Sequence, residues 1–239
     1  MNPYLWRLIF INIIQTGSGI LCLFFAYKIY KRRLNKLTQL LAYGFLSYAI
    51  GAITIGLAMF IQSEIQYFIY LISAYSILLM YLFFYFFFSL LCKVDPLNSY
   101  NKKSTLIVLC LFSVMLFFIE FVYPNGIQLS FETNWSPYYN WKFLIVIYII
   151  YIPLDISVIK NFIKRYKTSN DQIFKKKLLL LFIGIQISFT YLYGGVLYNT
   201  WIDNELYRLF YPIFKLVLLL PAIFIIGYIT IKMEMEKEE

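Results

Sequence analysis

Residues 66–92 read QYFIYLISAYSILLMYLFFYFFFSLLC, without a single Asp, Glu, Lys or Arg. An α-helix needs about 20 consecutive apolar residues to cross the hydrocarbon core of a bilayer. The stretch is longer than that and predicts a transmembrane helix. Its segment 81–88, YLFFYFFF, places large rings on every helical face, so lipid or other helices are expected to surround it.

The rest of the chain repeats this pattern. Hydrophobic residues make up 62% of the sequence, the mean hydropathy is +0.72 and only 14% of residues are charged, against about 25% in a soluble domain. We therefore predict an all-α integral membrane protein in a cell membrane, with one domain covering residues 1–239. The other expected spans are residues 5–28, 37–61, 104–123, 142–163, 178–200 and 207–231.

Basic residues between the spans indicate the orientation. Most of the 21 Lys and Arg residues fall at 28–36, 93–103, 160–177 and after 231, which are alternate connections on one side of the bilayer. Positive residues favour the cytoplasmic side. The seven helices are thus expected to start outside and end in the cytoplasm. The net charge of +9 is explained by this orientation, and no nucleic-acid partner is expected.

The predicted topology also allows an internal repeat. With the N-terminus outside, the first three and last three helices have the same orientation, so a 3+1+3 parallel arrangement is allowed. Lys31–Arg33 and Lys36 before Gly44 resemble Lys175–Lys177 before Gly184. Duplication and the common need for basic inner loops both explain this similarity. Small residues in the second span, among them Gly44 and Gly51, favour close helix packing.

Enzymatic chemistry has little support in this composition. Histidine is absent, which removes the commonest general base and metal ligand. Cys22, Cys92 and Cys110 lie in apolar runs without a CxxC pair, which indicates packing rather than a metal site or disulfides. No HExxH, GxSxG or paired aspartates occur. We expect no catalytic residues, no metal and no cofactor.

Ionisable residues inside predicted spans are the main functional clues, because a charge at the bilayer centre costs at least ~2.5–3.5 kcal/mol. Lys215 lies about 12 Å, and Asp155 about 20 Å, from the outer end of its helix at 1.5 Å per residue. The two could form an ion pair, and Glu120 is a rival partner for Lys215. Pro153 and Pro212 precede these charges closely and free backbone carbonyls that can line a cavity.

Polar residues on the first, fifth, sixth and seventh spans are expected to turn toward one another rather than toward lipid. A structural ion pair, a ligand or ion site, and an internal water pocket all remain open as explanations. Residues 124–141, rich in Trp and Tyr, form either an interfacial belt or a lid. The candidate ligand-binding residues are Asn12, Gln15, Asp155, Gln186 and Lys215.

Several local segments resemble the seven-helix N-terminal sensor domain of prokaryotic histidine kinases. Only MEMEKEE follows Lys232, where such proteins continue into an effector. The resemblance therefore implies a stand-alone sensing or scaffold module that signals through a separate protein; it carries over no site residue. The similar segments are MNPYLW at 1–6, KIYKRR at 28–33, FFSLLCK at 87–93, KKKLLLLFIGI at 175–185 and IIGYITIKME at 225–234.

Our leading hypothesis is a non-enzymatic, receptor-like membrane protein that binds a small or lipid-like ligand and acts through a cytoplasmic signalling partner. The alternatives are a small solute transporter, which resembles the seven-helix sugar transporters in topology, and an accessory subunit of a membrane complex. A lysine in the last span also invites comparison with microbial rhodopsins. However, Tyr211 stands where those proteins usually have Asp, and residues 66–92 offer no counterion, so retinal is not favoured.

Overall fold

The computed structural model describes most of the chain, and the described part is mostly helical. The described residues are 11–31, 36–58, 60–61, 64–92, 107, 110, 113–114, 126–129 and 137–235. Its regular elements are a π-helix η1 (Ile11–Thr16), the helices α2 (Gly17–Lys31), α3 (Lys36–Ala58), α4 (Glu64–Leu91), α6 (Trp141–Thr168), α7 (Gln172–Thr200) and α8 (Glu205–Met235), and the strands β1 (Ile127–Gln128) and β2 (Tyr138–Tyr139).

Within these described residues, six helices are long and apolar enough to cross a membrane. This confirms six of the predicted spans and is compatible with a multi-pass membrane protein. The fourth expected span, residues 104–123, lies largely outside the described residues. The six candidate spans are Ile13–Lys31, Thr38–Ala58, Ile65–Leu91, Trp141–Thr168, Gln172–Thr200 and Glu205–Thr230.

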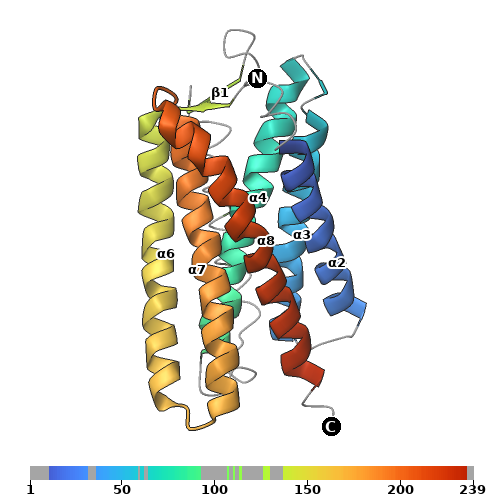
Figure 1. Cartoon of the computed structure of the whole chain (residues 1–239), viewed down its shortest axis with the longest axis vertical. Coiled ribbons are helices and arrows are strands. Elements are labelled where there is room, and N and C mark those ends of the chain that lie inside the picture. The colour runs from blue at the N-terminus through green and yellow to red at the C-terminus, as the bar shows by residue number, and fades with distance from the viewer. Residues whose placement is uncertain are drawn as a thin grey trace.

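The helices form one bundle whose long axis is vertical in Figure 1. α2 runs downward, α3 upward and α4 downward, and then α6, α7 and α8 repeat these directions. Since α4 ends at the lower end and α6 begins at the upper end, residues 92–140 connect opposite ends of the bundle. α8 crosses obliquely, with its upper half beside α7 and its lower half reaching α2.

Close packing between α3 and α4 builds the most extensive helix contact. A Cβ atom at Gly51 would lie only 2.7 Å from both the Ser73 carbonyl oxygen and Ile77 Cγ1, so only glycine fits here. The Ser73 hydroxyl donates a hydrogen bond to the Gly51 carbonyl. The expected role of the small residues in this helix is confirmed at Gly51.

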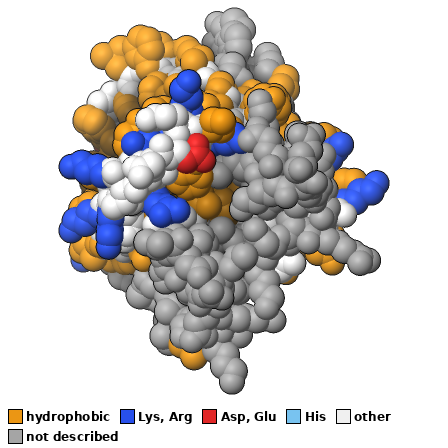
Figure 2. Space-filling model, turned by 90° about the horizontal axis from the view of Figure 1, so that it is seen from below, with side chains coloured by type: hydrophobic (Ala, Val, Ile, Leu, Met, Phe, Trp, Pro, Cys, Tyr) orange, Lys and Arg blue, Asp and Glu red, His pale blue; other side chains and the backbone are white. Residues whose placement is uncertain are grey.

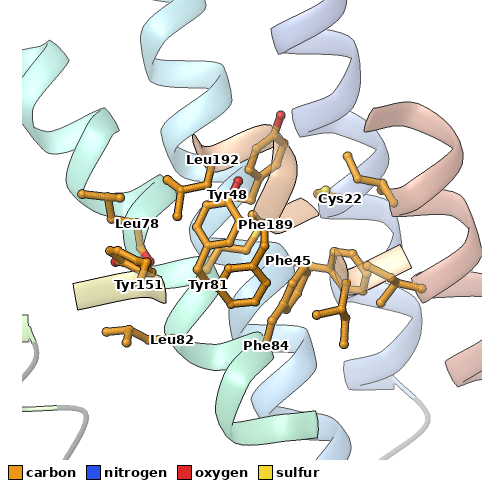
Figure 3. Close-up of a cluster of buried hydrophobic side chains, with 14 of the residues drawn as sticks. Cys22, Phe45, Tyr48, Leu78, Tyr81, Leu82, Phe84, Tyr151, Phe189 and Leu192 are labelled. Carbon is orange, nitrogen blue, oxygen red and sulfur yellow. The ribbon is translucent and has the colours of Figure 1, made fainter. Parts of the chain in front are cut away.

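Aromatic side chains fill the interior where the helices converge (Figure 3). Phe45 meets Phe84 edge-on at 5.7 Å between ring centroids, and Phe25 lies against Phe45 at the same distance. Nearer the lower end, Phe162 and Phe182 stack at 4.0 Å and join α6 to α7. Such rings contribute large buried areas together with preferred edge or stacked geometries.

Polar side chains cap the first turns of α6 and α7. The Asn140 side chain accepts from the Lys142 amide at the start of α6, and Asp171 accepts from the Ile173 and Phe174 amides at the start of α7. These caps satisfy amides that have no partner inside their helices. α8 continues through Pro212 and Pro221, and α6 continues through Pro153.

A short strand pair lies at the upper end of the bundle (Figure 1). Ile127 pairs with Tyr139 and Gln128 with Tyr138 in antiparallel register. Tyr139 is buried, and its hydroxyl lies 2.6 Å from the Tyr70 hydroxyl of α4. Part of the aromatic 124–141 segment is therefore packed onto the helices rather than free; Trp135 lies outside the described residues.

Basic residues gather at the opposite, lower end, where Figure 2 shows several Lys and Arg side chains around a small acidic patch. This is the end at which α2 stops, α6 turns into α7, and α8 terminates. Lys142 and Arg208 lie near the upper ends of their helices. Basic residues of the lower end whose side chains are described include Lys28, Lys31, Lys160, Lys164, Arg165, Lys167, Lys175, Lys176 and Lys177.

Candidate ligand-binding site

Lys215 is half-buried in α8, inside a candidate membrane span, and its described partners are neutral. Its Nζ donates a hydrogen bond to Gln15 Oε1 and lies 5.0 Å from the centre of the Tyr191 ring. A cation over an aromatic face gains roughly 0.5–2 kcal/mol. Neither partner carries a compensating negative charge, so the ammonium remains able to bind an anion.

Gln15 reaches Lys215 from η1, where the chain forms a π-helix before entering α2. The Gln15 side chain is buried, and the Ser18 hydroxyl donates to its backbone carbonyl at 2.8 Å. Ser18 also lies 2.9 Å from the Tyr48 hydroxyl of α3. Short π-helical segments are frequent at functional sites, and here the segment is tied to α3 through Ser18.

The Tyr191 ring, which faces Lys215, is positioned by a series of stacked aromatic rings between α7 and α8. The Tyr211 hydroxyl donates to the Tyr191 carbonyl at 2.8 Å, and Tyr207 donates to the Gly194 carbonyl at 2.9 Å. Tyr207 and Tyr211 stack at 5.6 Å, and Trp201 continues the series above Tyr207. A Cβ at Gly194 would lie 2.5 Å from the Tyr211 ring, so glycine makes room for the series.

Tyr81 contributes a hydroxyl without a hydrogen-bond partner among the described residues. Its side chain is fully buried in α4, with Tyr151 on one side and Tyr48 on the other (Figure 3). A buried polar group left unpaired costs about 1–3 kcal/mol, so this hydroxyl marks a position where a polar partner is favoured.

Removing that hydroxyl is expected to stabilise the protein after its lipids and ligands have been stripped away. Tyr81→Phe should raise the free energy of unfolding by about 1 kcal/mol, because it removes an unpaired buried group. The matched control is Tyr151→Phe, which loses the 3.0 Å hydrogen bond to the Leu78 carbonyl and should lower it by about 1 kcal/mol. Unfolding by SDS in mixed micelles measures both. If the two variants lost the same free energy of unfolding, the Tyr81 hydroxyl would have a hydrogen-bond partner.

Asp155 belongs to a second polar group, between α6 and α7. Its Oδ1 accepts from Gln186 Nε2 at 2.8 Å, and its Oδ2 lies 3.4 Å from the donating Tyr193 hydroxyl. Tyr148 donates to the Tyr193 carbonyl at 2.8 Å and meets the Tyr193 ring edge-on. The carboxylate is half-buried and, like Lys215, has neutral hydrogen-bond partners among the described residues.

The predicted residues thus form two groups instead of one. Gln15 joins Lys215, and Gln186 joins Asp155, so the expected Asp155–Lys215 ion pair is not formed within the described part of the chain. α7 separates the groups and contributes Tyr191 to one and Tyr193 to the other. The Asn12 side chain and Glu120 lie outside the described residues.

Tyr191, Tyr193 and Tyr81 were missed in the sequence because tyrosine is so abundant in this chain, at 23 residues, that no single one stands out. One signal was present: Gln186 and Tyr193 are seven residues apart and share a helical face. The unpaired state of Tyr81 depends on packing between separate helices, which no local pattern reports.

Two of the three thiols, Cys22 and Cys92, are poorly placed to react. Cys22 is fully buried, and burial raises the pKa of Cys92, just after the α4 span, to about 12. A thiol with such a pKa stays protonated and weakly nucleophilic at neutral pH. Within the described ranges, no three His, Cys, Asp or Glu side chains gather closely enough to hold a metal.

Comparison with protein-family models, with curated proteins and with solved structures finds no match for this chain. What the structure defines is a mostly helical protein with six described helices suited to a membrane and two polar groups on opposite sides of α7.

Proposed function

We propose that this protein is a non-enzymatic membrane receptor that binds a small or lipid-like ligand at Lys215 and acts through a separate cytoplasmic partner. The neutral surroundings of Lys215 support the proposal most strongly. Burying its charge inside a membrane span costs energy that Gln15 and the Tyr191 ring recover only in part. An anionic group at Nζ would supply the missing compensation.

The partner would dock at the basic lower end. In this proposal the chain crosses the membrane seven times, with residues 104–123 as the fourth crossing and the lower end in the cytoplasm, as positive residues favour. The lower ends of α6 and α7 carry exposed Lys164, Lys167 and Lys176. Such a cluster attracts acidic surfaces of a cytoplasmic protein and speeds encounter with them.

Mass spectrometry of the gently purified protein tests both parts of the proposal. The wild-type protein should carry a non-covalent adduct of defined mass and retain a cytoplasmic partner. In Lys215→Met the adduct should fall at least tenfold, because the only described cation at this depth of α8 is lost. Lys142→Met, which removes an exposed lysine at the start of α6, is the matched control and should keep the adduct.

Equal adduct in all three proteins would overturn the assignment of the site to Lys215. Absence of any adduct and any partner from the wild-type protein would overturn the receptor function. Size-exclusion profiles of the three proteins show that each is folded when it is measured.

A small solute transporter is the second candidate, and Asp155 favours it. An intramembrane carboxylate beside Pro153, with neutral hydrogen-bond donors, suits a site that a cation or proton occupies during transport. Substrate-driven flux into proteoliposomes that Asp155→Asn abolishes would support transport. If the wild-type protein and Asp155→Asn both bound ligand but neither showed flux, the receptor function would be favoured over transport.

A further inference from the structure

We propose that the outer face of α6 binds an anionic phospholipid, with its acyl chains along a row of exposed isoleucines and its phosphate at Lys160 and Lys164. This surface is separate from the site at Lys215, and the proposal does not depend on the receptor function. Three features lead to it: a single exposed face, a change from apolar to basic at the depth of a headgroup, and lysines that the hairpin of α6 and α7 does not neutralise.

The exposed residues of α6 lie on one side of the helix. Residues separated by three, four or seven positions share a helical face, and this spacing links exposed residues over most of the helix. The isoleucines among them are 42–66% exposed. Leu154 and Val158 lie on the other side and are buried. The exposed side, here called the outer face, includes Ile145, Ile149, Ile152, Ile156, Lys160 and Ile163.

The outer face is turned away from the rest of the bundle. In Figure 1 α6 stands at one edge, with α7 beside it. Asp155, Gln186 and the stacked Phe162 and Phe182 rings mark the side of α6 that meets α7. Because the isoleucines lie on a different side of α6 inside a candidate membrane span, lipid chains are the neighbours that suit them.

The outer face changes from apolar to basic at a defined depth. Lys160 lies 19 positions after Trp141, the first residue of α6, or about 28 Å along the helix axis. The hydrocarbon core of a bilayer is about 30 Å thick, and an exposed Trp141 suits the opposite interface. Lys160 and Lys164, both exposed and one turn apart, are therefore level with the headgroups of one leaflet.

No carboxylate of α6 is directed toward these lysines. The single acidic residue of α6 is Asp155, which accepts from Gln186 on the α7 side. Asp171, in the connection to α7, accepts from the first amides of that helix. Lysines close to a membrane surface are attracted by anionic lipids. A lipid phosphate beside Lys160 and Lys164 would supply the negative charge that the hairpin lacks.

Aromatic contacts hold the basic end of the hairpin in place. The Phe162 and Phe182 rings stack at 4.0 Å, and the Arg165 guanidinium lies 5.3 Å from the centre of the Phe174 ring. These contacts join α6 to α7 at the level of the exposed lysines. A backbone that is already ordered reduces the cost of binding, so the two lysines present a preformed site to the phosphate.

Competition between two phospholipids tests the proposal. The full-length protein in detergent is given equal amounts of phosphatidylglycerol and phosphatidylcholine with the same acyl chains, and the retained lipid is measured by native mass spectrometry. The wild-type protein should retain at least fivefold more phosphatidylglycerol. The double variant Lys160→Gln/Lys164→Gln should retain the two lipids equally, and Lys160→Arg/Lys164→Arg should keep the preference.

The matched control removes two lysines from the same end of the bundle. Lys28→Gln/Lys31→Gln lies on α2, where the two ammonium groups stand over the Phe24 and Tyr27 rings. It should keep the preference for phosphatidylglycerol within twofold. An equal loss in both glutamine variants would overturn the site on α6, because general attraction by the basic end would then explain the binding.

Photolabelling of the wild-type protein locates the lipid without any substitution. Phosphatidylglycerol that carries a diazirine in one acyl chain should label the segment 145–163 of α6 at least fivefold more than α2. Equal labelling of the two helices, or no preference for phosphatidylglycerol in the wild-type protein, would overturn the proposal.

Soluble competitors distinguish a lipid from other sources of negative charge. Glycerol phosphate carries the same phosphate without acyl chains, and a polyglutamate peptide imitates an acidic protein surface. Neither should displace phosphatidylglycerol from the wild-type protein. Displacement by glycerol phosphate would assign the lysines to a soluble phosphate compound, and displacement by polyglutamate would assign them to the cytoplasmic partner. Either result would overturn the lipid site, and neither would bear on the adduct at Lys215.

Discussion

Gly51→Ala is expected to lower the free energy of unfolding by about 3 kcal/mol, the largest loss among the substitutions considered for this protein. The added methyl group would lie 2.7 Å from the Ser73 carbonyl oxygen, a backbone atom that moves only if α3 or α4 moves. It would also press on Ile77 Cγ1 at 2.7 Å. Separating the two helices would lengthen the Ser73–Gly51 hydrogen bond as well. SDS unfolding in mixed micelles measures the effect.

Gly17→Ala is the matched control for this prediction. Gly17 is exposed at the first position of α2, and a Cβ there would meet nothing within 4 Å. Alanine reduces the freedom of the unfolded chain, so a gain of about 0.5 kcal/mol is expected. If Gly51→Ala and Gly17→Ala had the same free energy of unfolding, α3 and α4 would not approach each other closely at Gly51.

Gly227→Ala should cost about 2 kcal/mol by a different route. The new Cβ would lie 2.5–2.6 Å from three atoms of the Phe25 ring. That ring is buried and confined by Phe45 and Phe224, so it cannot turn aside without disturbing both. The substitution is expected to loosen the lower contact between α8 and α2 while leaving the α3–α4 contact intact.

Thiol labelling distinguishes this local loosening from general unfolding. Cys22 is fully buried one turn before Phe25 on α2. In Gly227→Ala its modification by a small membrane-permeant maleimide should become faster, while Gly51 variants that are still folded keep Cys22 protected. Unchanged protection together with unchanged unfolding energy would contradict the proposed contact between Gly227 and Phe25.

The spans were predictable because hydropathy over about 20 residues is a strong signal in this chain. Six expected helices are confirmed. Their bounds differ from those expected mainly where α6 and α7 extend past the apolar runs, through basic residues, to the short connection between them. Asp171 is the N-cap of α7 at this connection, and Asn140 is the N-cap of α6 at the opposite end of the bundle. The close approach at Gly51 was also predictable, since small residues permit backbones to meet.

The partners of Asp155 and Lys215 were not predictable in the same way. A helix that is apolar on every side gives no dominant face from which its rotation in the bundle can be read. Depth along the membrane was similar for the two charges, which favoured a direct pair, but α7 lies between them. Gln186 and Tyr193 turn toward α6, while Tyr191 turns toward Lys215. Only the three-dimensional packing distinguishes these directions.

The π-helix at Ile11–Thr16 escaped prediction for a related reason. Its sequence, INIIQT, contains no residue that marks a π-turn. The sequence placed Gln15 correctly within the first span, yet its contact with Lys215 depends on how η1 meets α8, two elements at opposite ends of the chain.

The two prolines of α8 create two positions at which this helix bends more easily than α7. Proline has no N–H, so Pro212 and Pro221 leave the carbonyls of Arg208 and Val217 without their usual donors four residues ahead. Lys215 lies on the short segment between these two weakened turns. A ligand that pulls on the Lys215 ammonium therefore bends α8 at these turns more readily than it moves the whole helix. The lower half of α8 packs against Phe25 of α2, and this contact opposes the bending.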